Sequence, residues 1–401
     1  MSDAILVLNA GSSSLKFAVF TGNEDILAPA MRGKIAGIGT DPMFSAQNSA
    51  GGTVPDDFPP MDRGTGLDRL IPTLLDWVQA HSGGITLSAV GHRVVHGGQH
   101  HAAPARVTDA LLADLAALVA LAPLHQPHNL AAIRSVAALL PDLPQVACFD
   151  TSFHRTQSRL AQLFALPRAM ADDGILRYGF HGLSYDYIAS ALPNNLGQGG
   201  NGRVIVCHLG NGASLCAMKD RQSVATSMGF TALDGLVMGT RCGTLDPGVV
   251  LYLLDKGWGA EAITQLLYQE SGLLGVSGIS SDMAILEAST APQAQEAIDL
   301  FCYRAASQLA ALVPALGGLD AIVFTAGIGE KSARVRRGIC AQLHWMGVDL
   351  DTGANESHAT RISPPDSTID VLIIPTNEEA VIARATLALI SPVSPTKAAQ
   401  A

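Results

Sequence analysis

The chain has 401 residues, of which 48% are hydrophobic and 15% are charged, and its formal net charge is -10. This length predicts two domains rather than one, and the apolar fraction supplies enough side chains for two buried sheets. Nucleic acids and anionic membranes depend on a basic surface, so we expect neither as a partner of this acidic chain.

The start of the chain and its thiols suggest a cellular location. Residues 1–3 lack the basic start of a secretory signal. The six cysteines show no C-x-x-C spacing, which predicts reduced, buried thiols rather than disulfides or a zinc site. The most apolar long segment, residues 110–123, is interrupted by Asp114, is too short to span a bilayer and predicts a buried helix. We therefore expect a cytoplasmic protein.

The first pattern along the chain is a pair of apolar runs joined by a small, polar turn. Residues 5–8 and 15–20 predict two strands, and residues 9–14 between them are rich in Gly and Ser. Glycine lets the backbone approach a ligand, serine hydroxyls and turn N–H groups donate hydrogen bonds, and Lys16 adds a positive charge. The turn is typical of a phosphate site, although a Ser-rich hairpin turn without a ligand has much the same composition.

Two charged residues lie at the ends of predicted strands in the first half. Arg93 stands between two histidines and before a glycine turn, and its fork of donors fits a carboxylate or a phosphate. Asp150 directly follows a strand predicted over 145–149, where α/β folds collect functional groups, unless it caps a helix. We expect irregular or short β structure over 41–66 and helices over 107–121 and 129–140.

The second half of the chain repeats the opening pattern. Residues 204–207 predict a buried strand that leads into a Gly/Asn/Ser turn at 208–214, half a chain after the first turn. A third version follows at 321–330, where a strand again enters a glycine-rich turn. Turns that recur in this way indicate two related α/β halves that bind one nucleotide.

Three further segments of the second half carry candidate functional groups. His181 lies between a Phe and a Gly, so packing can hold its ring. Arg241 is the only cation of residues 226–247, and a buried arginine needs an anion as its partner. Glu378 and Glu379 begin a helix predicted over 378–390. They either stabilise the N-terminus of that helix or bind magnesium.

Strands and helices alternate along the chain, which predicts the α/β class. Loops are expected over 193–203 and 351–367, and a strand over 370–374. A crossover near Asp150 and a return near Ala380 predict an N-terminal α/β domain of residues 1–149 plus 381–401. Residues 150–380 are then a C-terminal, nucleotide-binding α/β domain.

With these motifs in place, the chain resembles the acetate and propionate kinase family over nearly its whole length. The resemblance rests on ten segments in the family's order: 9–20, 92–98, 122–125, 149–154, 177–182, 208–214, 226–247, 271–282, 324–330 and 375–379. It implies two similar α/β domains of the sugar kinase, Hsp70 and actin type, with the active site in the cleft between them. It also implies a homodimer.

The resemblance further implies a role for each matched residue. The catalytic matches are Asp150, His181, Arg241 and His125. The matches that bind the acid are Arg93, Val95, Leu124, Phe180 and Ala232. The matches that hold Mg²⁺, which Mn²⁺ can replace, are Asn9 and Glu378. The nucleotide matches are Ser12, Ser14, Lys16, His208, Leu209, Gly210, Asn211, Gly212, Asp282, Met283, Ala284, Gly327, Ile328, Gly329, Glu330 and Lys331.

Some positions depart from the family's usual residues. Ala284 stands where an arginine is usual, which weakens the expected nucleoside contact, and Lys331 replaces a usual asparagine. Ala232 replaces a common proline near the acyl pocket, and residues 183–185 read Leu-Ser-Tyr instead of Thr-Ser-His. None of these changes touches a residue expected to carry charge in the reaction.

The resemblance implies a magnesium-dependent kinase that moves the γ-phosphoryl group of ATP to acetate by direct in-line transfer. The products are acetyl phosphate and ADP, and the reaction is reversible. Val95 is β-branched and stiff, which favours acetate over longer acids. The alternatives are a propionate- or butyrate-preferring kinase, or a nucleotide-binding switch without catalysis on the same fold. The presence of Arg93, Asp150, His181 and Arg241 together favours the enzyme.

Overall fold

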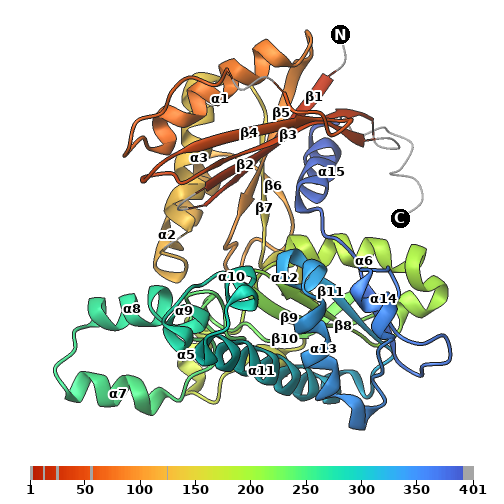
Figure 1. Cartoon of the computed structure of the whole chain (residues 1–401). Coiled ribbons are helices and arrows are strands. Elements are labelled where there is room, and N and C mark those ends of the chain that lie inside the picture. The colour runs from red at the N-terminus through yellow and green to blue at the C-terminus, as the bar shows by residue number, and fades with distance from the viewer. Residues whose placement is uncertain (1–2, 12–13, 24–26, 55–56, 124, 392–401) are drawn as a thin grey trace, which may run out of the picture. The chain divides into compact units, whose positions relative to one another are not determined.

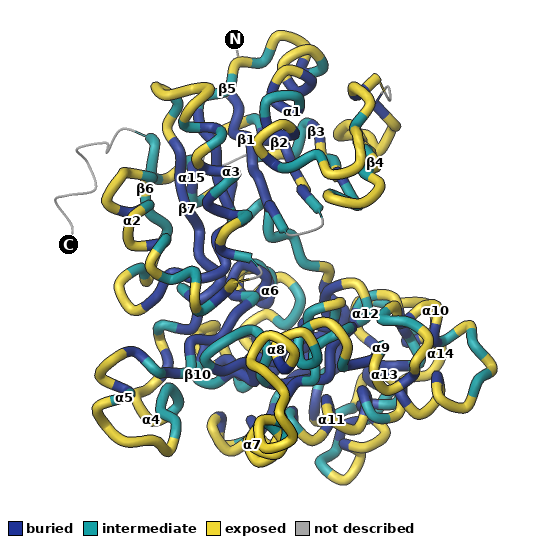
Figure 2. The backbone as a smooth tube through the Cα atoms, turned by 90° about the vertical axis from the view of Figure 1, so that its left-hand side faces the viewer, coloured by how far each residue is buried: buried dark blue, intermediate teal, exposed yellow. Residues whose placement is uncertain are grey.

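The computed structural model describes residues 3–11, 14–23, 27–54, 57–123 and 125–391. The chain forms two compact units: unit 1 comprises Met1–Ser152 and Asn377–Ala401, and unit 2 comprises Phe153–Thr376. Each unit contains one sheet with helices packed against it, and the strands at the middle of each sheet are buried (Figure 1, Figure 2).

The sheet of unit 1 has the strand order β4-β3-β2-β1-β5-β7-β6. Its strands are β1 (Asp3–Ala10), β2 (Ser14–Gly22), β3 (Leu27–Ala36), β4 (Met43–Asn48), β5 (Thr86–Val94), β6 (Ala105–Arg106) and β7 (Gln145–Phe149). Strands β1, β5 and β7 are parallel, whereas β2 is antiparallel to both β1 and β3. The helices are α1 (Leu67–His81), α2 (Asp109–Ala117), η1 (Val119–Leu121), α3 (Gln126–Leu139) and α15 (Glu378–Ile390).

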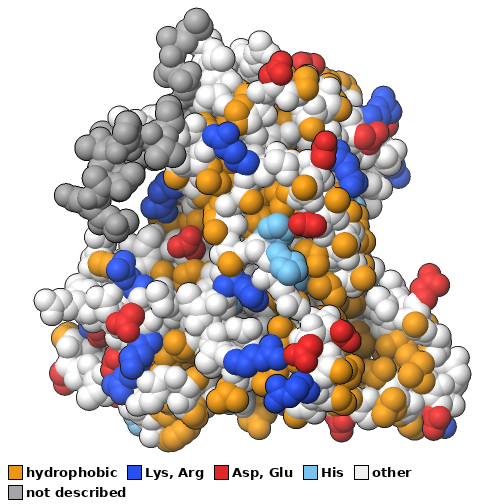
Figure 3. Space-filling view, turned by 180° about the vertical axis from the view of Figure 1, so that it is seen from behind, with side chains coloured by type: hydrophobic (Ala, Val, Ile, Leu, Met, Phe, Trp, Pro, Cys, Tyr) orange, Lys and Arg blue, Asp and Glu red, His pale blue; other side chains and the backbone are white. Residues whose placement is uncertain are grey.

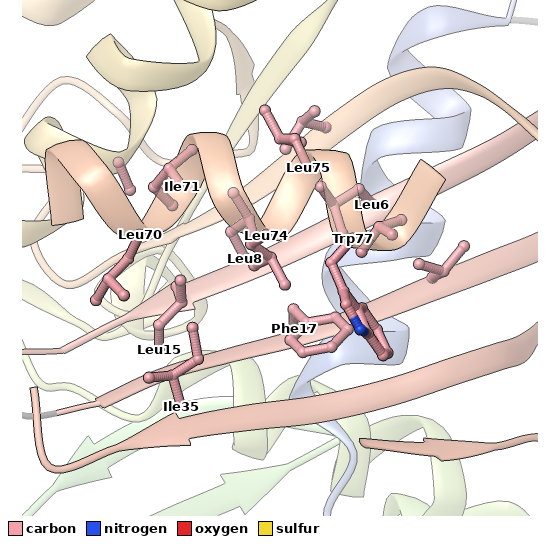
Figure 4. Close-up of a cluster of buried hydrophobic side chains, with 14 of the residues drawn as sticks. Leu6, Leu8, Leu15, Phe17, Ile35, Leu70, Ile71, Leu74, Leu75 and Trp77 are labelled. Atoms are coloured by element: carbon pink, nitrogen blue, oxygen red, sulfur yellow. The ribbon is translucent and has the colours of Figure 1, made fainter. Parts of the chain in front are cut away.

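Different helices cover the two faces of this sheet. On one face, Leu74 and Trp77 of α1 pack against Leu8 and Phe17 of the sheet (Figure 4). Val90 of β5 belongs to the same core, so its neighbour Gly91 faces the other side, where α15 lies. A Cβ on Gly91 would lie 2.6 Å from Ile382 Cγ2, so the glycine is what allows this close approach. The helix that begins with Glu378 is thereby fixed on the sheet.

The sheet of unit 2 has the strand order β10-β9-β8-β11-β12. Its strands are β8 (Val204–Leu209), β9 (Ala213–Lys219), β10 (Gln222–Thr226), β11 (Ala321–Thr325) and β12 (Asp370–Ile373). The helices before β8 are η2 (Ser152–Thr156), α4 (Arg159–Gln162), α5 (Arg168–Asp172), α6 (Gly182–Leu196) and η3 (Gly197–Asn201). Those after β10 are α7 (Pro247–Asp255), α8 (Ala260–Gln269), α9 (Gly272–Ser277), α10 (Met283–Ala288), α11 (Pro292–Leu316), α12 (Ala326–Lys331), α13 (Ala333–Ala341), η4 (His344–Met346) and α14 (Thr352–Glu356).

The sheet of unit 2 repeats part of the sheet of unit 1. Strands β8, β11 and β12 are parallel and β9 is antiparallel to both β8 and β10, which matches the order β3-β2-β1-β5-β7 in unit 1. Helix α6 packs on one face of this sheet through Tyr185, Ile188 and Leu192. The turn after β1 and the turn after β8 therefore occupy equivalent places. The predicted α/β class with two similar units is confirmed.

The structure differs from the sequence expectations in several segments. The loop expected over 193–203 is largely helical, since α6 continues to Leu196 and η3 follows over 197–201. Pro193 is tolerated because a proline near a helix end removes only one hydrogen bond. The loop over 351–367 contains α14, which Asp351 caps by accepting from the Ala354 N–H at 2.9 Å. The boundaries between the two units lie a few residues away from the predicted domain boundaries. Asp150 and Glu378, which were predicted in the C-terminal domain, therefore both lie in unit 1.

The cysteines, the helices and the surface charges bear on the expectations drawn from composition. All six cysteines are free, and every one except Cys242 is buried. Across the described residues, no helix is both long and apolar enough to cross a membrane. On the face drawn in Figure 3, Lys and Arg side chains are interspersed with Asp and Glu rather than gathered into one basic surface.

Candidate active site

In unit 1, the ends of three neighbouring strands bring Asn9, Arg93 and Asp150 together. Asn9 is near the end of β1, Arg93 is near the end of β5, and Asp150 follows β7. Arg93 Nε donates to the two carboxylate oxygens of Asp150 at 3.0 and 3.1 Å, and Arg93 Nη2 donates to Oδ2 at 2.6 Å. Arg93 Nη1 donates to Asn9 Oδ1 at 3.3 Å. Parallel strands end at one edge of a sheet, which explains this cluster.

The pairing with Asp150 fixes the charge and the orientation of the Arg93 guanidinium. The Asp150 side chain is 2% exposed and that of Arg93 is 21% exposed. Burial by itself lowers the pKa of Arg93, but the negative charges of Asp150 and Glu378 outweigh it and hold this pKa above its usual value. Asp150 therefore occupies the Nε–Nη2 edge of the guanidinium, and Asn9 accepts from its Nη1 side.

The first turn of α15 adds carboxylates to this cluster. Asn377 caps the helix, since its Oδ1 accepts from the Ala380 N–H at 3.1 Å. The charges of Glu378 and Glu379 both raise the pKa of Arg93, and Glu378 has the larger effect. Magnesium takes oxygen ligands, commonly one or two from the protein and the rest from phosphates and water. The amide oxygen of Asn9 and the carboxylate of Glu378 fit that pattern.

A second feature of unit 1 is a cavity of about 440 Å³ whose lining includes Lys16, Arg32 and Lys34. Lys16 on β2 and Lys34 on β3 are directly opposite each other in the sheet. Ser14 closes the preceding turn, because its carbonyl oxygen accepts from the Gly11 N–H at 2.8 Å. Ser12, the other serine predicted in this phosphate turn, lies outside the described residues. Arg32 and Lys34 gave no signal in the sequence, since exposed cations on a strand are common.

The predicted acyl-pocket and histidine positions of unit 1 lie near the cluster in the chain. Val95 directly follows β5 and is 4% exposed, and its N–H donates to Asn129 Oδ1 at 3.0 Å. Asn129 Nδ2 donates to the Ala10 carbonyl at 2.7 Å, so this amide ties the ends of β1 and β5. The sequence did not single out Asn129. His125 is half-buried at the start of α3, and Leu124 lies outside the described residues.

In unit 2, two stacked imidazoles lie beside the turn after β8. The rings of His181 and His208 have centroids 4.2 Å apart and planes 16° apart. His181 Nδ1 is 2.8 Å from Ser214 Oγ, which is also 2.5 Å from the Tyr185 hydroxyl. His208 Nδ1 is 2.8 Å from Ser184 Oγ. Ser184 and the atypical Tyr185 of α6 thus support the two imidazoles, which the sequence alone did not indicate.

Arg241 and His181 approach the same point on the turn after β8. A Cβ on Gly212 would lie 2.9 Å from Arg241 Nη2 and 3.2 Å from His181 Nε2, so only glycine leaves both nitrogens this close to the backbone. Arg241 Nη1 donates to the Ala232 carbonyl at 2.7 Å, which orients the guanidinium. The adjacent Phe180 is 1% exposed. Val95 belongs to unit 1 whereas Phe180 and Ala232 belong to unit 2, so their shared acyl pocket stays a prediction.

A cavity of about 470 Å³ in unit 2 is lined by half of the predicted nucleotide residues. Its lining includes eight of them: Gly210, Asn211, Asp282, Met283, Ala284, Gly327, Ile328 and Lys331. Ser281, Glu287 and Ser332 also line it and were not predicted. Asp282 serves as a helix cap here, since its Oδ1 accepts from the Ala284 N–H at 2.8 Å. The volume is in the range of small-molecule sites.

Other predicted nucleotide residues have structural partners. Leu209 is fully buried in β8, and a Cβ on Gly329 would lie 3.5 Å from the Cys207 carbonyl oxygen and 3.7 Å from Leu209 Cβ, so these two residues pack together. Residues 327–331, expected as a loop, belong to helix α12. Glu330 Oε1 accepts from the N–H groups of Ala326 and Thr376.

The chain as a whole is similar to known proteins in sequence and in structure. A family model described as the Acetokinase family matches residues 4–384. A Rhodopseudomonas palustris protein named acetate kinase is 54% identical, and the match covers 96% of this chain and 98% of that protein. A propionate kinase structure from Francisella tularensis is similar with a TM-score of 0.88 and 36% identity, covering 96% of this chain and 98% of the other. An acetate kinase structure from Porphyromonas gingivalis has a TM-score of 0.86 and 33% identity, covering 97% and 100%.

Proposed function

Because the chain belongs to the acetokinase family, we propose that it transfers the γ-phosphoryl group of ATP to acetate, with acetyl phosphate and ADP as products of a reversible reaction. The protein is an enzyme, a phosphotransferase whose acceptor is a carboxyl group, and ATP and ADP are its co-substrates. The observation that carries the choice of acetate is the nearly full-length similarity to a protein named acetate kinase. The cations of both units agree with it, since two anions must be held together by an acidic protein.

We propose that the two half-sites divide the chemistry between the acid and the phosphoryl group. Arg93 binds the acetate carboxylate through its Nη1 side while Asp150 holds the guanidinium in place. A carboxylate oxygen attacks the γ-phosphorus in line, and the bond from that phosphorus to the β,γ-bridging oxygen breaks, which leaves ADP. Arg241 and His181 stabilise the charge on the equatorial oxygens. Acetate is already ionised at pH 7, so Asp150 is not needed as a base.

Magnesium is proposed as the resident metal, with Asn9 and Glu378 as its protein ligands. The ion supplies positive charge that neutralises the β- and γ-phosphate oxygens. Glu378 is preferred to Glu379 because it has the stronger electrostatic effect on Arg93 and therefore on the cluster that contains Asn9. Manganese, which accepts the same oxygen ligands, is expected to substitute.

The homodimer is also a proposal, and an apolar helix supports it. No residue of α7 is buried, yet this helix carries Val249, Leu251, Tyr252 and Leu254, which are 41%, 66%, 60% and 49% exposed. Clustered apolar side chains of this kind mark protein–protein contacts. A second copy of the chain is the occupant we propose, and sedimentation of the protein together with Leu251→Lys tests it. A cytoplasmic location is proposed from the six free thiols.

An ADP-release assay with formate, acetate, propionate and butyrate, run with and without magnesium, tests the activity. We expect the highest kcat/KM for acetate, a lower value for propionate, a lower one still for butyrate, and no turnover without a divalent ion. A maximum at propionate would favour the alternative suggested by the similar propionate kinase. Nucleotide binding without turnover of any acid would favour the non-catalytic switch.

A further inference from the structure

The carboxylate of Glu330 joins two backbone segments of unit 2. Its Oε1 accepts from the Ala326 N–H at 2.9 Å and from the Thr376 N–H at 3.2 Å. Ala326 begins α12, which contributes Gly327, Ile328 and Lys331 to the lining of the nucleotide cavity. Thr376 is the last residue of unit 2 before the chain enters α15. One side chain therefore ties the wall of the cavity to the segment that leads to Glu378.

Both backbone groups depend on this side chain. Ala326 has a φ of 64°, a left-handed conformation that a residue with a Cβ seldom adopts, and its N–H at the helix start has no partner within the helix. β12 ends at Ile373, and the Ile374 N–H still donates to the Phe324 carbonyl at 3.1 Å. Thr376 lies beyond that last bond to β11, so Glu330 is what holds its N–H.

A different side chain holds the opposite end of α12. Arg336 is fully buried, and its Nη1 donates to the carbonyl oxygens of Gly329 and Glu330 at 2.9 and 3.0 Å. Its Nε and Nη2 donate to the side chain and the backbone of Asn355 at 2.7 and 2.8 Å. The C-terminal end of α12 is thus anchored independently of the Glu330 side chain. Within the described part of the chain, that side chain is the group that accepts from both Ala326, at the N-terminal end, and Thr376.

We propose that Glu330 is a positioning residue that couples nucleotide binding in the unit 2 cavity to the backbone at Thr376, and through it to Glu378. This inference rests on the proposed function, because it takes the cavity to bind the nucleotide. It gives Glu330 a role through two backbone N–H groups in place of the direct nucleotide contact that the family resemblance implied. Binding linkage requires the reverse effect as well: a fixed Thr376 favours nucleotide binding.

Two substitutions of Glu330 separate the effect of its side-chain length from the effect of its charge. Glu330→Gln keeps the length and an acceptor oxygen but removes the charge. Glu330→Asp keeps the charge but is one methylene shorter and cannot bridge both N–H groups. We expect kcat to stay within about twofold in Glu330→Gln and to fall about 10-fold in Glu330→Asp, and the magnesium concentration for half-maximal rate to rise only in the latter. Glu356→Asp, at an exposed carboxylate of α14, is the matched control and should leave kcat unchanged.

Amide hydrogen exchange of the full chain, with and without ADP, gives a readout that does not depend on the acid. ADP should slow exchange at the Thr376 N–H in the native protein and in Glu330→Gln, but not in Glu330→Asp. If Glu330→Gln loses as much kcat as Glu330→Asp, the charge acts on a ligand directly and the proposal is wrong. It is equally wrong if ADP protects Thr376 in all three proteins or in none. If ADP protects the Thr376 N–H as expected but the protein does not phosphorylate acetate, the proposed function is refuted and the coupling between the nucleotide cavity and Thr376 is not.

Discussion

Replacement of Asp150 by alanine tests whether its carboxylate holds the Arg93 guanidinium in place. In the native protein Asp150 is 2% exposed and accepts three hydrogen bonds from Arg93, of 2.6 to 3.1 Å. The variant leaves a guanidinium that is only 21% exposed without its nearest counter-charge. Removal of one partner of a buried ion pair costs about 3–5 kcal/mol. We expect about 2–3 kcal/mol here, because Arg93 keeps some contact with water and the charge of Glu378.

Urea unfolding followed by tryptophan fluorescence measures this loss in unit 1. Trp77 is 4% exposed in the core of unit 1, whereas Trp258 and Trp345 lie in unit 2 and can be replaced by phenylalanine to leave one reporter. With a denaturant slope of about 2 kcal/mol per molar, the unfolding midpoint should fall by about 1 M. An unchanged midpoint would refute the view that Asp150 neutralises a buried cation.

A double substitution separates lost charge pairing from lost packing. Arg93→Met added to Asp150→Ala removes the unpaired guanidinium, so the double variant should unfold at a higher urea concentration than Asp150→Ala alone. If the double variant is instead less stable, the cost of Asp150→Ala lies in packing. Acetate kinase activity should be lost in both variants, because neither can present an oriented guanidinium to the acid.

Four other predictions concern single residues. Arg241→Ala should lower kcat about 100-fold or more at saturating substrate, the loss expected for a cation that acts on the transition state, and near-native turnover would contradict its role. Glu378→Gln should raise the magnesium requirement more than Glu379→Gln does, and the reverse order in a magnesium titration would move the metal to Glu379. Val95→Ala should lower the ratio of kcat/KM for acetate to kcat/KM for propionate, by an amount equivalent to about 1–3 kcal/mol at most. An unchanged ratio would mean that another residue limits the size of the acyl pocket. Burial lowers the pKa of His154 from 6.5 to about 4, so the unfolded chain binds the proton more tightly, and this group should remove about 3 kcal/mol of stability as pH falls through this range. Burial shifts the pKa values of His92 and His96 in the same way, so His154→Gln should reduce the pH dependence of the urea midpoint without abolishing it, and an unchanged dependence would contradict the prediction.

The elements that could be predicted from the sequence are those with short-range signals. Helix α15 and strand β7 have the predicted bounds, because an asparagine cap and a short apolar run ended by Asp150 are both local patterns. The repeated turns after β1 and β8 were predicted for the same reason. Helix α12 was expected as a loop, since Gly327 and Gly329 disfavour helices and the side chain that anchors it, Arg336, lies outside the segment.

The site could be predicted only as a set of residue types. Arg93 and Asp150 were both singled out, but their pairing was not, because nothing local connects residues 57 positions apart. Asn129, which bonds a carbonyl 119 positions away, carried no signal at all, since a buried amide looks like any other polar residue of a helix. Contacts of this kind are set by the parallel strand order, which a single sequence does not display.

The hydroxyls of Tyr185 and Ser214 decide which ring nitrogen of His181 carries its proton. Burial raises the pKa of the Tyr185 hydroxyl well above its usual value, so this group keeps its proton and can donate it. When it donates to Ser214 Oγ, the serine proton turns towards His181 Nδ1 and the imidazole takes the Nε2–H tautomer. Nε2 is the atom beside Arg241 Nη2 at Gly212. In that tautomer the Nε2–H of His181 is a hydrogen-bond donor beside the permanent cation of Arg241, so both groups can donate to the same anion.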